Sequence, residues 1–83
     1  ATRELAELNI NDSRRNGDLL AERLGPWSPL DAATLRTRCF LLSQLTGATI
    51  ALVLETRPAE ARRLLREFDV LIDTVFEPPA RPA

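Results

Sequence analysis

The chain has 83 residues, of which 45% are hydrophobic and 28% charged, and its formal net charge at pH 7 is −1. It contains no His and no Lys, and Cys39 is its single cysteine. These absences exclude a His-assisted nucleophile, a Schiff-base lysine, a zinc site of the usual Cys and His type, and an internal disulfide. We therefore expect a protein that is not an enzyme, holds no metal and needs no cofactor.

The chain is long enough for one small domain. Its helix-capping residues and the positions of its Gly and Pro residues predict an all-α fold with three helices. Residues 1–10 mix a few apolar side chains with charges and are predicted to form a turn or loop. The helical domain is predicted over residues 11–77. Its first helix, 11–24, starts at Asn11 or Asp12, because either side chain can accept a backbone N–H bond at a helix start.

We also make predictions for one residue within that first helix and for one in the turn after it. Gly17 costs about 1 kcal/mol relative to Ala inside a helix, so its presence suggests a compensating close contact. Trp27 lies between two prolines in the turn that follows, and we expect it to cover the end of the core.

The second helix is predicted over 29–55 and the third over 58–77. Ser28 is a good N-cap for the second helix, and Pro29 suits its first position. The third helix is amphipathic, with its apolar side chains on one face. The Pro-rich tail, 78–83, is predicted to be disordered.

The stretch from Cys39 to Leu54 contains no charged residue. Sixteen residues are fewer than the roughly 20 that a helix needs to cross a bilayer, so we do not expect a membrane protein. A helix that is apolar on all sides must be buried on all sides. Two short flanking helices cannot cover it, which predicts that another chain supplies the remaining contact.

The two faces of the second helix differ in side-chain size. Large aliphatics, including Leu35, Leu42 and Val53, form one face and are predicted to make the intrachain core. A stripe of small residues spaced four apart forms another face, on which a helix of a second copy can approach closely. We call it the small-residue stripe, and it comprises Cys39, Ser43, Gly47 and Ala51. The predicted dimer interface combines this stripe, its neighbours and part of the third helix: Cys39, Phe40, Ser43, Gly47, Ile50, Ala51, Leu54, Leu64, Phe68, Leu71 and Val75. Two copies would then form a four-helix bundle.

Three stretches of the chain resemble the C-terminal part of TetR-family transcriptional repressors. The first comprises Leu5–Leu8, Ser13–Asn16 and Leu19–Leu24, the second is Leu41–Ala48, and the third is Glu60–Glu67. The resemblance implies a homodimer in which the last two helices form a four-helix bundle, a small apolar effector, and operator binding only through an N-terminal helix-turn-helix domain that is absent from this chain.

If the resemblance holds, part of an effector pocket lies on the first and second helices, and we expect it to be lined by Leu20, Leu41, Leu45, Ala48 and Leu52. The expected location is cytoplasmic. Two alternatives remain open: a free-standing helical adaptor that binds a different protein and no ligand, and a small enzyme or lipid carrier with an aliphatic cavity.

Overall fold

The computed structural model describes residues 2–78, and within that range the protein is all-α, which confirms the predicted fold class. Three α-helices follow one another: α1 (Thr2–Leu24), α2 (Ala32–Glu55) and α3 (Pro58–Val75). A short 3-10 helix, η1 (Gly25–Trp27), connects α1 to α2. Except for Pro78, the predicted disordered tail lies outside the described residues.

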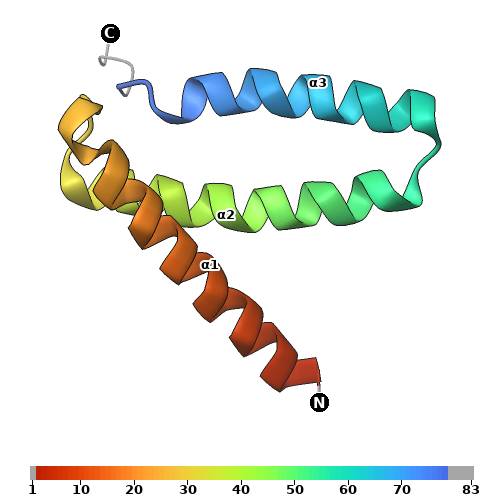
Figure 1. Cartoon of the computed structure of the whole chain (residues 1–83), viewed down its shortest axis with the longest axis horizontal. Helices are drawn as coiled ribbons and strands as arrows, with labels where there is room; N and C mark the ends of the chain where they lie inside the picture. The colour runs from red at the N-terminus through yellow and green to blue at the C-terminus, as the bar shows by residue number, and fades with distance from the viewer. Residues whose placement is uncertain (1, 79–83) are drawn as a thin grey trace, which may run out of the picture.

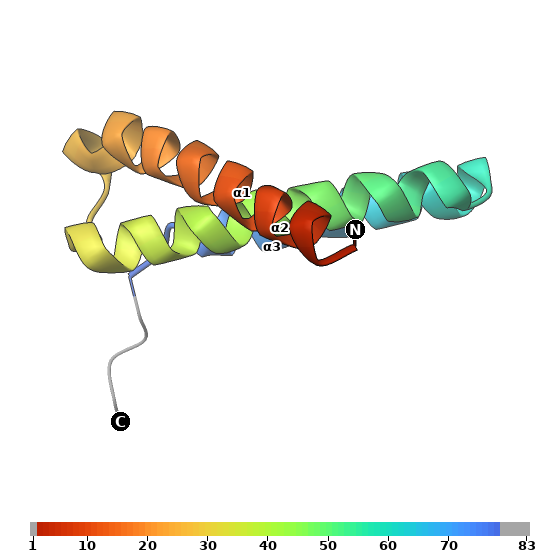
Figure 2. The same cartoon turned by 90° about the horizontal axis from the view of Figure 1, so that it is seen from below.

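Helices α2 and α3 form an antiparallel hairpin, and α1 crosses it. Figure 1 shows α2 and α3 side by side, with α1 crossing the N-terminal half of α2. The view from below in Figure 2 shows α1 above that half of α2, and Figure 1 shows its N-terminal end pointing away from the hairpin. The Cα radius of gyration is 14.8 Å, whereas a compact domain of this length has a radius of about 12 Å. The fold is therefore open.

Helix α1 is longer than predicted. It includes the N-terminal residues that were expected to form a turn or loop, and it begins at Thr2. The stretch has no Gly or Pro and is rich in Leu, Ala, Glu and Arg, all good helix formers. Asn11 and Asp12 therefore lie inside the helix and do not cap it.

Helix α2 begins three residues later than predicted. Its N-cap is Asp31, whose carboxylate accepts a bond from the Thr34 backbone N–H at 2.8 Å. That bond is the main reason that the pKa of Asp31 lies below its ordinary value. The Ser28 hydroxyl instead accepts a bond from the Leu30 N–H at 3.1 Å and closes a local turn. The N-cap prediction at Ser28 was wrong because a better-placed carboxylate follows it.

Helix α3 runs from Pro58 to Val75 and ends two residues before the predicted position. Its end is fixed by Arg38 of α2, whose Nη1 donates to the carbonyl oxygens of Val75 and Glu77, each at 2.7 Å. The last carbonyls of a helix have no partner within the helix. Arg38 satisfies two carbonyls at this end and joins it to α2.

A candidate assembly surface on the helical hairpin

The core of the chain is small and lies where α1 crosses α2. Leu35 and Cys39 are the only buried hydrophobic side chains among residues 2–78, with exposed fractions of 2% and 0%. Burial raises the pKa of the Cys39 thiol above its ordinary value. Both side chains lie on the part of α2 that α1 covers, so α1 builds the core that the chain has.

Glycine makes this crossing possible. A Cβ at Gly17 would lie 2.7 Å from the backbone N and 2.8 Å from the Cα of Phe40. Because both are backbone atoms, only a residue without a side chain allows this approach. The predicted close contact at Gly17 is confirmed. Beside it, the Arg14 guanidinium lies 4.5 Å from the centroid of the Phe40 ring, a cation–π contact that also joins the two helices.

The structure contradicts the predicted role of Cys39 in a dimer interface. The start of the small-residue stripe is covered by α1 of the same chain, and Cys39 has no exposed surface. Farther along the stripe, Gly47 is exposed and nothing lies within 4 Å of a Cβ built on it. The stripe is thus divided into a covered start and an open end.

The large aliphatic face also differs from the prediction. Leu35 is buried, but Leu41, Leu45 and Leu52 are exposed by 56%, 54% and 49%. They were expected either to form the core or to line a pocket, and no helix of this chain covers them. The reason is geometric, because α1 crosses α2 at Leu35 and Cys39, and α3 packs beside the half-buried Leu42 and Val53.

Two further predictions were wrong or only partly met. Trp27 does not cover the core, because its side chain is 85% exposed in η1. The predicted effector residues do not form one pocket. Leu41 and Leu45 line a groove of about 310 Å³ between α2 and α3, whose lining does not include Leu20, Ala48 or Leu52.

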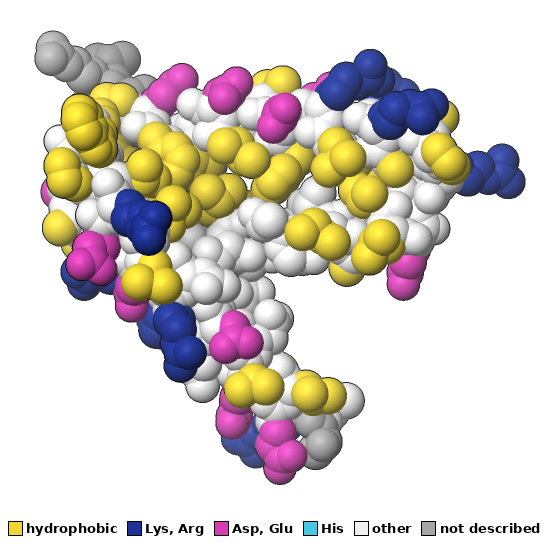
Figure 3. Space-filling model, in the orientation of Figure 1, with side chains coloured by type: hydrophobic (Ala, Val, Ile, Leu, Met, Phe, Trp, Pro, Cys, Tyr) yellow, Lys and Arg dark blue, Asp and Glu magenta, His cyan; other side chains and the backbone are white. Residues whose placement is uncertain are grey.

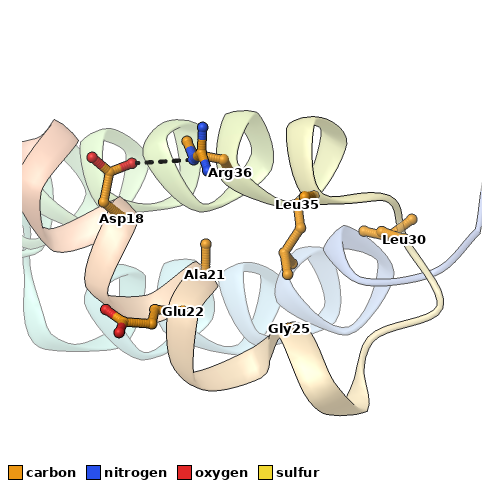
Figure 4. A pocket seen from close by; sticks show the side chains of 8 residues that line it. Asp18, Ala21, Glu22, Gly25, Leu30, Leu35 and Arg36 are labelled. Atoms are coloured by element: carbon orange, nitrogen blue, oxygen red, sulfur yellow. Dashed lines mark ion pairs between the residues drawn. The ribbon is translucent and has the colours of Figure 1, made fainter.

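A larger depression lies between α1 and the start of α2 (Figure 4). It measures about 540 Å³, and Leu35 points into it toward the junction of α1 and η1. Asp18 and Arg36 form an ion pair of 3.8 Å at its edge, and both side chains are more than half exposed. Such a pair contributes less than about 1 kcal/mol in water. No Ser, Thr, Cys or Lys side chain lines this depression, so it offers none of the usual nucleophiles.

The interface residues predicted on α3 are arranged in two groups. Leu64, Phe68 and Val75 are half-buried on the side of α3 that faces α2, so the chain itself partly covers them. Leu71 lies at the edge of this row and is 63% exposed. On α2, the predicted residue Ser43 is half-buried and its hydroxyl donates to the Cys39 carbonyl oxygen at 3.0 Å. Ile50, Ala51 and Leu54 are exposed beyond the end of the α1 crossing.

The hairpin therefore presents a large apolar surface, part of which Figure 3 shows along α2 and α3. Thirteen large hydrophobic side chains within residues 2–78 are exposed, eight of them on α2 and α3, four on α1 and one on η1. The chain has a solvent-accessible surface of 6916 Å² and a mass of 9.3 kDa, whereas a compact protein of that mass has about 5,000 Å². Residues 1 and 79–83 can account for at most about 800 Å² of this surface, which still leaves an excess of roughly 1,000 Å².

Helix α2 is also long and apolar enough to cross a membrane by length and composition, and 6% of its most apolar window is buried. The core helix of a soluble protein meets the same criterion. Within residues 2–78 no group of three or more His, Cys, Asp or Glu side chains is placed to hold a metal ion.

The Arg38 contact was not predicted from the sequence. The available signal was an arginine directly before the uncharged run of α2, opposite the end of α3 in an antiparallel hairpin.

Comparisons with known proteins found no family model, curated protein or solved structure that matches the chain.

Proposed function

We propose that this chain is a helical assembly module that pairs with a second copy of itself through the apolar surface of the α2–α3 hairpin. The observation that carries the proposal is the set of eight large hydrophobic side chains exposed on α2 and α3. The surface of the whole chain exceeds that of a compact monomer by roughly 1,000 Å². A standard protein interface covers about 800 Å² on each partner. The excess is thus as large as one side of a stable dimer.

The specific form that we propose is the C-terminal dimerisation and ligand-sensing region of a TetR-like transcriptional regulator. Its support is the resemblance of the three sequence stretches, together with an antiparallel pair of long helices that leaves apolar surface uncovered. In this proposal the protein is cytoplasmic and contacts operator DNA only through an N-terminal domain outside this chain.

Analytical ultracentrifugation of the purified chain over a dilution series tests the pairing. We expect a species of twice the 9.3 kDa chain mass that dissociates reversibly on dilution. A helical monomer at every concentration would overturn self-association, and a monomer that floats with phospholipid vesicles would assign α2 to a membrane. A monomer that forms a stoichiometric complex with one different protein would favour the adaptor function.

The regulator context has a separate test. The gene sequence upstream of the codon for Ala1 is expected to encode a helix-turn-helix domain in the same reading frame. A start codon directly before the Ala1 codon, with an in-frame stop codon upstream of it, would refute the regulator and leave the assembly module standing.

A further inference from the structure

The two flanks of α2 are not equally available to a partner. At 100° per residue, Leu41, Leu45, Ala48 and Leu52 lie together on one flank of the helix. Cys39, Ser43 and Ile50 lie on roughly the opposite flank. Helix α1 covers the start of that flank and leaves Cys39 with no exposed surface, whereas Ile50 lies beyond the crossing and is exposed. A second helical hairpin therefore has a continuous path only along the flank that begins at Leu41.

The open flank has the spacing of a helix-pairing seam. Its four residues follow one another at intervals of four, three and four, the pattern by which side chains of one helix enter the gaps of another. Leu41, Leu45 and Leu52 are each about half exposed or more. In contrast, Leu42, Thr49 and Val53 on the neighbouring side of α2, toward α3, are half-buried. The seam is thus the apolar row that the chain does not cover.

We infer that a second copy of this chain packs its α2 antiparallel along this flank, an inference that rests on the proposed self-association. One register pairs every seam residue. Leu41 lies opposite Leu52 of the partner subunit, and Leu45 lies opposite Ala48 of the partner subunit. Registers shifted by one turn leave a leucine at one end without an apolar counterpart.

The charges at the two ends of the seam favour the same register. Arg38 lies one turn before Leu41, and the exposed Glu55 lies one turn after Leu52. In the antiparallel register Arg38 faces Glu55 of the partner subunit, and the two-fold axis repeats this pair at the other end. The carbonyl bonds of Arg38 use Nη1, and a guanidinium carries five N–H donors, so other donors remain for a carboxylate.

The surface is also shaped for this contact. The groove of about 310 Å³ is lined by Leu41, Leu42 and Leu45 of α2 and by Thr74 and Val75 of α3. In the proposed register it lies opposite Leu52 of the partner subunit, whose side chain would enter it as a knob enters a hole. The flank that the sequence assigned to an effector is thereby the contact between copies, and the small-residue stripe is not.

A matched pair of substitutions tests which flank is used. Leu45→Glu and Leu54→Glu make the same change on two exposed leucines of α2 that lie on different flanks. We expect Leu45→Glu to weaken dimerisation at least about 100-fold, because a carboxylate would be buried without a partner. Leu54→Glu should leave the dissociation constant nearly unchanged, and circular dichroism should show that both variants keep their helices.

The outcomes separate this inference from the proposed function. A wild-type chain that is monomeric would overturn self-association itself. A wild-type dimer that tolerates Leu45→Glu, or that dissociates with Leu54→Glu, would overturn the choice of flank and leave self-association standing.

Disulfide trapping tests the register. In a Cys39→Ala background, Leu41→Cys with Leu52→Cys is expected to give a covalent dimer on mild oxidation. The two positions are about 16 Å apart along one helix, too far for a bridge within a chain. The control combines Leu41→Cys with Leu54→Cys and should stay largely uncross-linked. Equal cross-linking of both pairs would overturn the antiparallel register.

Discussion

The two halves of α2 have similar amino-acid composition but different surroundings. The first half lies under α1 and contains Leu35 and Cys39, the only buried hydrophobic side chains of residues 2–78. The second half contains Leu54, which is 80% exposed. Apolar content does not distinguish the halves. The difference arises from Gly17, which lets α1 come into backbone contact with one half, so local geometry decided what was buried.

The largest difference in stability is expected between a leucine truncation in the first half of α2 and the same truncation in the second half. Leu35→Ala should lower the free energy of unfolding by about 2–5 kcal/mol, because it removes a fully packed side chain and leaves a cavity. Leu54→Ala should change it by less than about 0.5 kcal/mol, since a substitution at an exposed site has little effect. Urea denaturation followed by circular dichroism measures both values. Equal losses would show that the two halves do not differ in solution.

The two glycines of α1 and α2 offer the same substitution in a covered and an open place. Gly17→Ala puts a methyl group against the Phe40 backbone and should destabilise the fold by about 1–3 kcal/mol. Gly47→Ala meets nothing within 4 Å and should stabilise the helix by about 0.5–1 kcal/mol. We therefore expect thermal melts to show a lower melting temperature for Gly17→Ala and a higher one for Gly47→Ala than for the wild type. A stabilising Gly17→Ala would contradict the close crossing.

Arg38 sharpens the comparison because it belongs to the covered half yet holds the end of α3. Arg38→Gln removes the charged donor to the carbonyls of Val75 and Glu77, and we expect a loss of about 1–2 kcal/mol. Hydrogen exchange should accelerate first in the last turn of α3. Arg36→Gln is the control, because its exposed ion pair with Asp18 contributes little. Uniform exchange across all helices would refute a local role for Arg38.

The smallest effect concerns the Cys39 thiol. Because burial raises its pKa in the folded chain, the thiol ionises first in the unfolded chain, near the ordinary value of 9.0. Its contribution to stability is fully present below that pH and is lost as the pH rises toward the folded pKa. The slope of stability against pH above 9 should be flatter in Cys39→Ala. An aromatic disulfide reagent should also react slowly with Cys39 until denaturant is added.

The sequence predicted the class of fold and the position of the turns more closely than the packing. The predicted end of the first helix at residue 24 and the start of the third at residue 58 depend on Gly25, Pro26 and Pro58. The backbone preferences of Gly and Pro are local, so a single sequence is enough to recognise them. The packing of α2 could not, because its run of aliphatic residues is nearly symmetric around the helix. Nothing in that run says which flank α1 will occupy.

The errors at the candidate site have the same origin. Cys39 was assigned to a second chain because small residues permit close approach, but the helix that approaches is α1 of the same chain. Leu41 and Leu45 were assigned to a core or a pocket because they are large. Arg38 was missed because its partners are backbone carbonyls 37 and 39 residues away, and side-chain patterns carry no record of such contacts.

Trp27 is the single tryptophan of the chain and lies almost fully in solvent beside Leu24, Pro29 and Phe76. The protein thus carries one intrinsic fluorophore, placed at the bend between α1 and α2. Its emission should resemble that of free indole in water as long as this bend stays wet. A molecule that binds at this bend and excludes water from the indole would shift the emission to the blue. The fluorescence of Trp27 therefore reports binding at the end of the protein opposite the α2–α3 loop.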